Sequence, residues 1–377
     1  MLKIIGGVVE MTYVKGLEGI IAAETKVGHV DGEKGQLIYR GYWAKDLAIN
    51  YSFEEVSYLI WNGTLPNHDE LKAFKQKMVT HRTLPANIVA LMDCLPKDTE
   101  VMSALRTCIS ALGDPSYSWP PTKEQALAIT AVTPTIIAYW YRKMNDLEVV
   151  EPNEHLDHVA NYLYMINGEI PDQSLVTALN AYFVLTIEHG MNASTFSSRV
   201  ISSTESDMVS AICGAIGAMK GPLHGGAPSG VITMFDEIGS EENIEPWVRE
   251  KLDNKEKIMG FGHRVYRTHD PRAEALKEVS KQISGDNGLF DLIVKIEDKT
   301  IELLNEYKPG RGIYTNVEYF AAAVMKAVEL PSELFTPTFT ASRVVGWTAH
   351  VVEQSENNRI YRPQSAYIGY TPVEQNQ

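Results

Sequence analysis

Start signals for α-helices recur along this 377-residue chain, whereas patterns typical of β-strands are scarce. The segments Asn67 to Glu70 and Thr122 to Gln125 have the spacing of a capping box, in which two side chains bond each other's backbone N–H groups at a helix start. After the first segment, Leu71, Phe74 and Met78 repeat at the interval that places side chains on one helix face. These local signals predict a mainly helical chain.

Apolar spacing, glycines and prolines place the other helices. An apolar stripe from Val101 to Leu112 stops at Gly113, as helices often do before a glycine. Thr133-Pro134 predicts the start of a new helix, because proline fits the first helical position. We expect further helices over residues 154–167, 172–188, 205–219, 272–283, 290–307, 318–328 and 341–356.

The best strand signals lie within residues 27–41. Asp31-Gly32 and Lys34-Gly35 mark turns there, and Leu37-Ile38-Tyr39 is short and extended in character. The predicted fold class is therefore mainly α with a short N-terminal β-hairpin.

A chain of this length has room for two domains. The glycines and prolines of 221–226 interrupt the helical pattern, and so does the segment 330–337. We therefore expect a large helical domain built from residues 1–224 and 325–377, and a small domain formed by residues 225–324.

The charge of the chain excludes one class of partner. It has 34 Lys and Arg against 48 Asp and Glu, a net charge of −14. Nucleic-acid binding needs a positive face, so we expect no nucleic acid as a partner. A small acidic substrate remains possible, since it needs only a few local arginines.

Cysteine usage and hydropathy indicate a cytoplasmic protein. Cys94, Cys108 and Cys213 are an odd number without zinc-ligand spacing, and their apolar context predicts buried, reduced thiols. The uncharged run from Gln125 to Tyr141 is too short and polar for a membrane span. The first ten residues lack a convincing signal-peptide cleavage site. We expect neither secretion nor a membrane partner.

Residues 259–272 are the most informative stretch for function. His263 lies there between glycine-freed backbone and a group of arginines, because Gly260 and Gly262 let the main chain approach a ligand closely. Asp270-Pro271 predicts an N-cap and the first position of a helix. The arginines are Arg264, Arg267 and Arg272. An imidazole among them suits a small polyanion that also exchanges a proton, and the alternative is a solvated basic loop.

His224 lies in a second glycine-rich run, residues 221–228. If a helix begins just after it, the positive helix end would depress the pKa of the imidazole. A neutral imidazole donates a hydrogen bond to a developing oxyanion. The alternative is a histidine in a tight turn.

Four further residues are candidates of lower specificity. His189 at a helix end could bind a carboxylate, and Glu318 at a helix start could act as a general base. Arg343 and Arg362 could bind carboxylates through two hydrogen bonds each. Taken singly, each has a structural explanation: a charge that complements a helix dipole, or a surface salt bridge.

Motifs of competing chemistries are missing from the sequence. It contains no His-Glu-x-x-His or Cys-x-x-Cys pattern, no Walker A motif, no strand-flanked Gly-x-Gly-x-x-Gly and no Gly-x-Ser-x-Gly. We therefore expect no bound metal and no redox cofactor.

Taken together, the segments GPLHGGA, GFGHRVYRTHDPRA, NVE and SRVVGW, in this order, resemble the citrate synthase family. The match runs from Gly16-Leu17-Glu18-Gly19 to Arg362-Pro363, nearly the whole chain. The resemblance implies a mostly α homodimer whose small domain closes over acetyl-CoA and oxaloacetate. It also implies that no cofactor is needed, since the CoA thioester is a substrate.

The resemblance assigns a role to each candidate. His224 polarises the thioester carbonyl, His263 protonates the carbonyl oxygen of oxaloacetate, and Glu318 is the base. The implied ligands of oxaloacetate and citrate are His189, His263, Arg272, Arg343 and Arg362, the last from the neighbouring subunit. The implied CoA ligands are Lys257, Ile258, Met259, Gly260, Phe261 and Arg267.

The base departs from the family pattern, which is usually Asn-Val-Asp. Glu318 has one more methylene, which displaces its oxygens by roughly 1 Å, and misplacement on that scale can cost on the order of 100-fold in rate. Two alternatives therefore stay open: a 2-methylcitrate synthase that uses propionyl-CoA, and a catalytically weak paralogue that binds CoA or a dicarboxylate.

Overall fold

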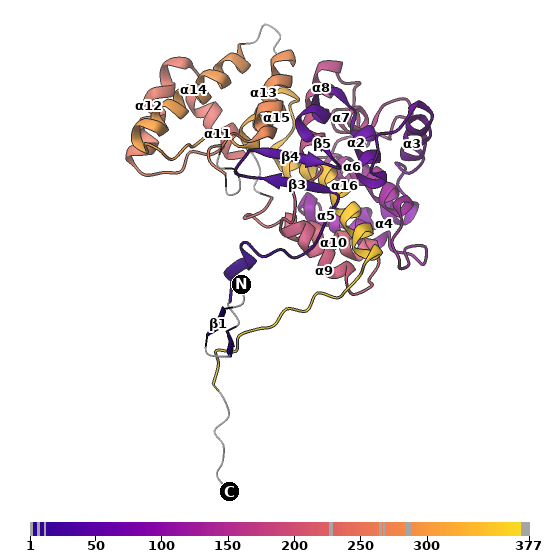
Figure 1. Cartoon of the computed structure of the whole chain (residues 1–377). Coiled ribbons are helices and arrows are strands. Elements are labelled where there is room, and N and C mark those ends of the chain that lie inside the picture. Colours follow the sequence, from indigo (N-terminus) through magenta and orange to yellow (C-terminus); the bar gives the residue numbers. More distant parts are fainter. Residues whose placement is uncertain are drawn as a thin grey trace.

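Helices build almost the whole body of the protein (Figure 1). The computed structural model describes residues 3–5, 8–10, 13–225, 229–263, 266, 268–283 and 288–370. Within these residues the chain forms sixteen α-helices and two small antiparallel sheets. The predicted mainly α class is confirmed.

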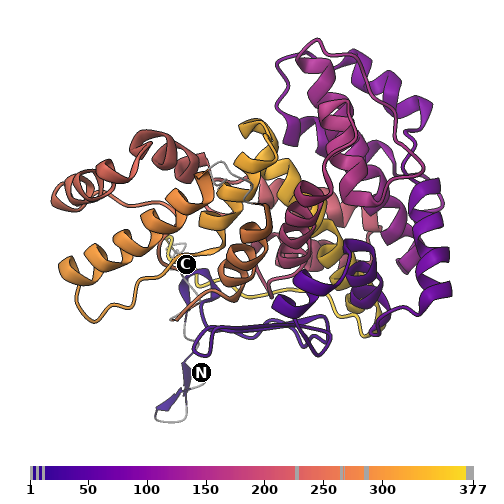
Figure 2. The ribbon, with the colours of Figure 1, turned by 90° about the horizontal axis from the view of Figure 1, so that it is seen from above.

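The helices form a larger and a smaller lobe (Figures 1 and 2). The larger lobe contains α1 (Ala44–Asn50), α2 (Phe53–Asn62), α3 (His68–Thr80), α4 (Ala86–Cys94), α5 (Val101–Ala111), α6 (Lys123–Met144), α7 (His158–Asn167), α8 (Gln173–Thr186), α9 (Ala193–Ser202), α10 (Met208–Met219) and α16 (Phe335–Glu356). The smaller lobe contains α11 (Ser229–Ile238), α12 (Ile244–Asp253) and α14 (Leu289–Tyr307). Between them, α13 (Pro271–Ile283) and α15 (Val317–Ala327) pack against each other and against α8.

The strands lie near the N-terminus. β3 (Gly28–Asp31), β4 (Gln36–Tyr39) and β5 (Tyr42–Trp43) form one antiparallel sheet, and β1 (Lys3–Ile5) pairs with β2 (Val8–Glu10) in another. The predicted hairpin within 27–41 is therefore confirmed. The hydroxyl of Tyr39 lies 3.0 Å from the carbonyl oxygen of Leu185 and 2.8 Å from that of Glu188. This contact ties the hairpin to the end of α8.

Both predicted capping boxes form. The side chain of Asn67 caps α3 and that of Thr122 caps α6, each with its reciprocal bond. A third capping box, Ser52 with Glu55, starts α2 and was not predicted. The predicted first residues of two helices were wrong. Helix α7 begins at His158 rather than at 154, and α10 begins at Met208 rather than at 205.

Two predictions based on proline were wrong. Pro134 lies inside α6, which continues unbroken because it is buried over most of its length and packing outweighs the lost hydrogen bond. α16 begins at Phe335 rather than 341, because Pro337 falls in its first turn, where no N–H is needed. The prediction for Cys94 was also wrong, since this side chain is exposed.

Helix α16 lies at the centre of the larger lobe, where α2, α6, α8, α9 and α10 pack around it. A Cβ atom at Gly346 would lie 2.2 Å from the carbonyl oxygen of Ile187, so only glycine allows this approach. At Gly214 in α10, a Cβ would meet Ile201 Cδ1 at 2.1 Å, which is the far end of a flexible side chain.

We predict that Gly346→Ala lowers the free energy of unfolding by about 1–3 kcal/mol, because the backbone of Ile187 must shift to make room. Gly214→Ala is the matched control: rotation of Ile201 relieves the clash, and the helix gains about 1 kcal/mol from replacing glycine. Urea unfolding of both variants checks this. Equal losses of stability would contradict the close approach at Gly346.

Candidate active site

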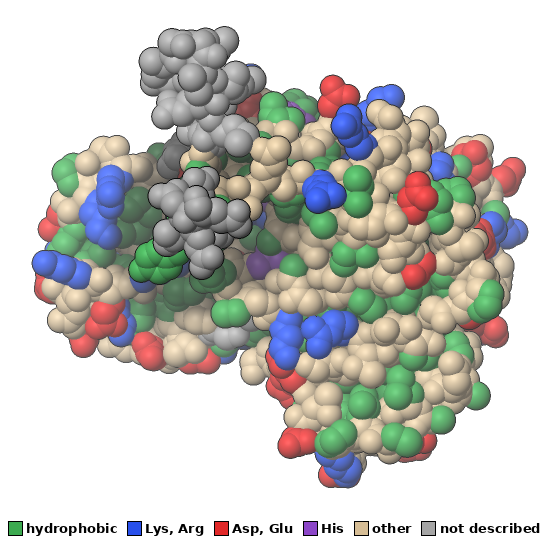
Figure 3. Space-filling model, turned by 90° about the horizontal axis from the view of Figure 1, so that it is seen from below, with side chains coloured by type: hydrophobic (Ala, Val, Ile, Leu, Met, Phe, Trp, Pro, Cys, Tyr) green, Lys and Arg blue, Asp and Glu red, His purple; other side chains and the backbone are tan. Residues whose placement is uncertain are grey.

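A cavity of about 410 Å³ lies between the lobes and gathers most of the predicted site residues. Figure 3 shows the hollow, with histidine at its floor. The predicted residues that line it come from five separate segments and are His189, His224, Lys257, His263, Arg272, Glu318 and Arg343. The isolated candidates of the sequence thus share one cavity.

His224 is held by the start of α9. Its Nε2 lies 2.7 Å from Ser194 Oγ and accepts the Ser194 N–H at 3.3 Å. A ring nitrogen that accepts from an N–H carries no proton, so the neutral ring carries its hydrogen on Nδ1. Trp347 Nε1 donates to the same Oγ at 2.9 Å. Ser194 and Trp347 therefore set the tautomer of His224, a role for which their sequence context gave no signal.

Burial, followed by the charge of Arg343, lowers the pKa of His224 to about 4. The predicted direction agrees. Helix α11 begins at Ser229, and residues 226–228 lie outside the described part of the chain. The imidazole is neutral at physiological pH and able to donate a hydrogen bond from Nδ1.

Asp270 holds Arg272 behind His263. It caps α13 as predicted, accepting the Arg272 N–H at 3.0 Å. Its two carboxylate oxygens also accept Arg272 Nε at 3.0 Å and Nη2 at 2.8 Å. Both side chains are nearly inaccessible to solvent. This pair fixes a buried guanidinium at the cavity wall.

His263 faces Arg272. The Tyr266 N–H donates to His263 Nδ1 at 3.0 Å, which leaves the hydrogen of the neutral ring on Nε2. Arg272 Nη2, also a donor, lies 3.3 Å from that Nε2. Burial and Arg272 lower the pKa of His263 to about 4. Two donors directed at one region form a ready position for an oxygen acceptor that contacts both.

His189 lies just beyond the end of α8, near these two residues. Its Nε2 is 3.2 Å from the hydroxyl of Tyr266, and its ring packs edge-on against that of His263. Burial lowers the pKa of His189 well below its usual value, and the charges of Arg272 and Arg343 lower it further. The ring is therefore neutral and borders the region that Arg272 and Arg343 share.

Backbone bonds join the His263 loop to the helix that carries Glu318. Phe261 and Thr315 form an antiparallel bridge, and the Gly262 N–H donates to Tyr314 O at 2.8 Å. Gly260 and Gly262 have φ values of +82° and +80°, which explains why glycine is needed at both. The predicted loop residues Ile258, Gly260 and Phe261 are buried, and the side chains of Ile258 and Phe261 belong to the hydrophobic core.

Glu318 lies in the first turn of α15. Asn316 caps this helix by accepting the Glu318 N–H at 3.0 Å, and its Nδ2 donates to Gly262 O at 2.9 Å. Burial raises the pKa of the Glu318 carboxyl, and the charges of Lys257 and Arg272 oppose that rise. A carboxylate whose pKa is raised in this way is a stronger base.

Arg343 is 1% exposed, yet its guanidinium lines the cavity. Its Nε donates to Thr186 O, and the group lies 4.7 Å from the centre of the Phe339 ring. Among the described residues, no carboxylate lies within 4.0 Å of its nitrogens. A buried cation with this freedom is suited to a carboxylate ligand.

Of the predicted CoA-loop residues, Ile258, Met259, Gly260 and Phe261 do not line the cavity. Arg362 lies away from it altogether. It is exposed, in the segment after α16 that runs away from the body of the chain (Figure 1). Arg264 and Arg267 lie outside the described residues.

Comparison with known proteins shows the family of the chain. The family model described as citrate synthase, C-terminal domain, matches residues 16–364. The chain belongs to the citrate synthase family. A citrate synthase from Haloferax volcanii is 40% identical, over 96% of this chain and 98% of its own. A 2-methylcitrate synthase from Shewanella oneidensis is 39% identical, over 95% of both chains.

A solved structure is also similar: a citrate synthase from Thermoplasma acidophilum in a ternary complex with carboxymethyl coenzyme A and oxaloacetate. Its TM-score is 0.85 and its identity 30%, over 96% of this chain and 98% of that one. Membership of the citrate synthase family confirms the predicted family, the fold and the acyltransferase class.

Two further findings concern metal-binding clusters and membrane-spanning helices. Among the described residues, no three His, Cys, Asp or Glu side chains gather as they would to hold a metal ion. None of the helices in that part of the chain has the length and apolar character needed to cross a membrane.

We predict that acid destabilises this citrate synthase family member between about pH 6.5 and 4. His189, His224 and His263 have lowered pKa values when folded, so the unfolded chain binds more protons below pH 6.5. Stability is complete above that pH and is lost as pH falls. Urea unfolding at pH 7, 6 and 5 measures this loss of unfolding free energy.

His189→Asn should lose less stability than the wild type over this range, because it removes one imidazole whose pKa is lowered in the folded protein. His155→Asn is the control, since the side chain of His155 is 83% exposed. This substitution should leave the dependence of the unfolding free energy on pH unchanged. If the unfolding free energy of His189→Asn fell with pH as steeply as that of the wild type, the neutral state of His189 would be contradicted.

Proposed function

We propose that this chain is a citrate synthase that condenses acetyl-CoA with oxaloacetate to give citrate and CoA. The observation that carries the proposal is the single cavity in which a half-buried carboxyl, neutral histidines and two buried arginines meet. Oxaloacetate is a dianion with a ketone, and the arginines suit its carboxylates. The chemistry needs no metal and no redox cofactor.

The first step is proton transfer from carbon. Glu318 removes a proton from the methyl group of the thioester, and the raised pKa of its carboxyl favours this transfer. The Nδ1–H of His224 donates to the thioester oxygen and stabilises the enol or enolate. His224 is neutral, so it stabilises this oxygen by hydrogen bonding.

The second step forms the carbon–carbon bond. The enol carbon attacks the ketone of oxaloacetate, whose carboxylates bind Arg272 and Arg343 beside His189. The Nε2–H of His263 supplies the proton to the developing alkoxide, while Arg272 donates to the same region. Water then cleaves the thioester of citryl-CoA, releasing citrate and CoA.

Closure of two domains completes the site in this proposal. Residues 225–324 form the small domain, which carries His263, Arg272 and Glu318, and residues 1–224 with 325–377 form the large one. Closure keeps water out until condensation is complete. The backbone from Lys257 to Phe261 holds the CoA adenine, and Arg267 contacts a CoA phosphate.

We also propose a cytoplasmic homodimer in which Arg362 enters the partner's cavity. Arg362 is exposed and follows α16 in a segment that leaves the body. That segment exposes Ile368 and Tyr370 almost fully, and the N-terminal segment exposes Ile21, which a second subunit would cover.

A 2-methylcitrate synthase is the second candidate. The Shewanella oneidensis enzyme of that name is as similar to this chain as the citrate synthases are. One extra methylene on the acyl group changes binding by only about 1–3 kcal/mol, so the same cavity could accept propionyl-CoA.

The first prediction of the proposal is release of free CoA thiol when the protein is mixed with oxaloacetate and acetyl-CoA. His263→Ala should reduce the rate by about 100-fold or more, because the proton donor is lost. A thiol reagent measures the release. Faster release with propionyl-CoA would move the assignment to 2-methylcitrate synthase.

Glu318→Asp tests the remaining alternative in the same assay. A large rise in turnover would show that the longer side chain handicaps the base. If folded wild-type protein binds CoA but releases no thiol, the enzyme proposal is wrong. The catalytically weak paralogue that binds CoA or a dicarboxylate is then the remaining hypothesis.

The second prediction concerns the subunit origin of Arg362. Arg362→Ala and His263→Ala should each be inactive alone. Mixed dimers would contain one intact site, so co-expression should restore about one quarter of wild-type activity if the subunits mix at random. A co-expressed pair as inactive as the single variants would show that Arg362 does not act across the interface.

A further inference from the structure

Glu188 is a fully buried carboxylate that lies behind the cavity without lining it. It precedes His189 in the chain and follows the last turn of α8. A charged group in such a place is costly unless hydrogen bonds and an opposite charge stabilise it.

Two glycines leave the space that the Glu188 side chain occupies. A Cβ at Gly28 in β3 would lie 2.7 Å from Glu188 Cγ, and one at Gly346 in α16 would lie 3.0 Å from its Oε2. The carboxylate therefore fills a gap between the hairpin and the central helix of the larger lobe.

Directed hydrogen bonds hold the carboxylate in that gap. Its Oε1 accepts the Gly190 N–H at 2.6 Å, and its Oε2 lies 3.1 Å from His350 Nε2. His350 Nδ1 accepts from Arg199 Nε at 3.0 Å and Nη2 at 2.9 Å, so the hydrogen of the neutral ring is on Nε2 and points to Glu188.

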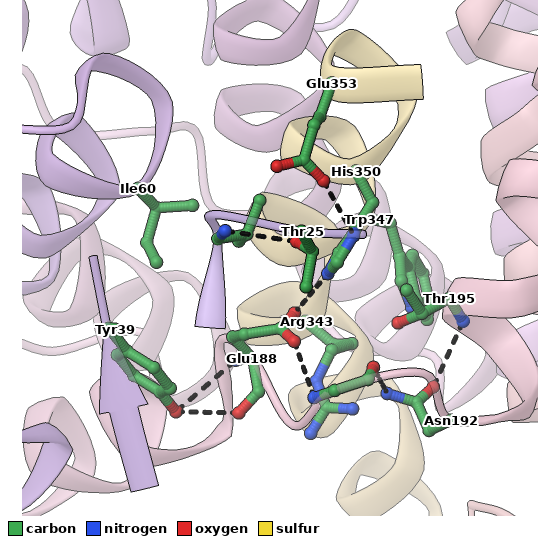
Figure 4. Close-up of polar contacts among 12 residues, drawn as sticks. Thr25, Tyr39, Ile60, Glu188, Asn192, Thr195, Arg343, Trp347, His350 and Glu353 are labelled. Carbon is green, nitrogen blue, oxygen red and sulfur yellow. Dashed lines mark hydrogen bonds and ion pairs between the residues drawn. The ribbon is translucent and has the colours of Figure 1, made fainter. Parts of the chain in front are cut away.

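The far side of this network is anchored as well, and Figure 4 shows Glu353 beside His350 there. Arg199 forms an ion pair with Glu353 and donates to Gln354 Oε1 at 2.9 Å. Glu353 in turn accepts the Lys26 N–H at 2.7 Å. The orientation of His350, and with it the bond to Glu188, is set by groups that lie away from the cavity.

Glu188 acts on two residues of the cavity. Its bond to the Gly190 N–H closes a turn in which Gly190 has a φ of +62°, and His189 is the residue inside that turn. Burial lowers the pKa of Arg343 to about 10, and Glu188 is the first of the charges that oppose this loss. The carboxylate therefore fixes the backbone of His189 and stabilises the charge of Arg343.

We propose that Glu188 is a positioning residue for oxaloacetate: its turn orients His189, and its charge stabilises that of Arg343, which lies about one turn before Gly346 in α16. The inference rests on the proposed function, which assigns both residues to this substrate. Acetyl-CoA binding should be nearly independent of Glu188, because the CoA loop lies in the other lobe.

The test is Glu188→Gln, which keeps the size of the side chain. Its amide has one acceptor oxygen, so its NH₂ group must face either the Gly190 N–H or the His350 Nε2–H, both donors. We expect the dissociation constant of oxaloacetate, measured by titration calorimetry, and its KM to rise on the order of 10- to 100-fold. The KM of acetyl-CoA should change less than about twofold.

Glu54→Gln is the matched control. Glu54 is also buried and accepts a backbone N–H, that of His158 at 2.7 Å, but it lies on α2 and does not line the cavity. We expect it to lower the melting temperature and leave oxaloacetate binding unchanged. If the Glu188→Gln variant binds oxaloacetate as tightly as the wild type, whatever its stability, the inference is overturned and the proposed function stays intact. Wild-type protein that binds no oxaloacetate would overturn both.

Tyr39→Phe decides the question if Glu188→Gln does not fold. It removes only the hydroxyl that bonds Glu188 O and Leu185 O, so it loosens the same turn while keeping the carboxylate. Oxaloacetate binding should weaken about threefold or more with acetyl-CoA unaffected. Unchanged oxaloacetate binding in this variant would contradict the positioning role.

Discussion

The buried pair of Asp270 and Arg272 is the constraint on which the geometry of the site depends. The Asp270 carboxylate accepts Arg272 Nε and Nη2, and its Oδ2 also accepts the Val317 N–H at 3.1 Å. It therefore caps α13 and holds the first residue of α15. Removing one member of such a pair leaves a buried charge without its partner, which costs about 3–5 kcal/mol. The positions of Arg272 and Glu318 are coupled through this one carboxylate.

The two buried arginines differ in how closely a carboxylate of the protein neutralises their charge, and this difference suits a dianionic ligand. Arg272 is neutralised by Asp270 at hydrogen-bond distance, whereas the carboxylate that acts most on Arg343 in the described part of the chain is the more distant Glu188. Their charges also lower the pKa of His189, after burial, and keep that ring neutral. The arginines thus provide the attraction for carboxylates, while the histidines stay neutral donors and acceptors at the same site.

Local sequence patterns predicted what is built locally. The capping boxes of α3 and α6 and the cap at Asp270 each involve residues within three positions, so the sequence carries their signal. The capping box at Ser52 carried the same signal and was overlooked. The glycine-framed histidines and the arginines were predicted from motifs, and the cavity brings most of them together.

Contacts between distant segments had no such signal. Ser194 meets Trp347 from 153 positions away, and Glu188 meets His350 from 162. The sequence could not indicate that Pro134 lies inside a helix either, because its surroundings are buried by elements far along the chain. The supporting residues of the site are therefore found only once the helices are packed.

The extra methylene of Glu318 has to be accommodated by the side chain itself. The backbone around it is fixed at three points: the Glu318 N–H bonds Asn316 Oδ1, Asn316 Nδ2 bonds Gly262 O, and the Val317 N–H bonds Asp270. A retreat of α15 would break these bonds and displace the His263 loop with it. The carboxylate therefore reaches further into the cavity than an aspartate at this position would, and it has one more rotatable bond to order before it accepts a proton. In the proposed reaction, we therefore expect any rate cost of the glutamate to come from that torsional freedom, since hydrogen bonds hold the backbone that presents it.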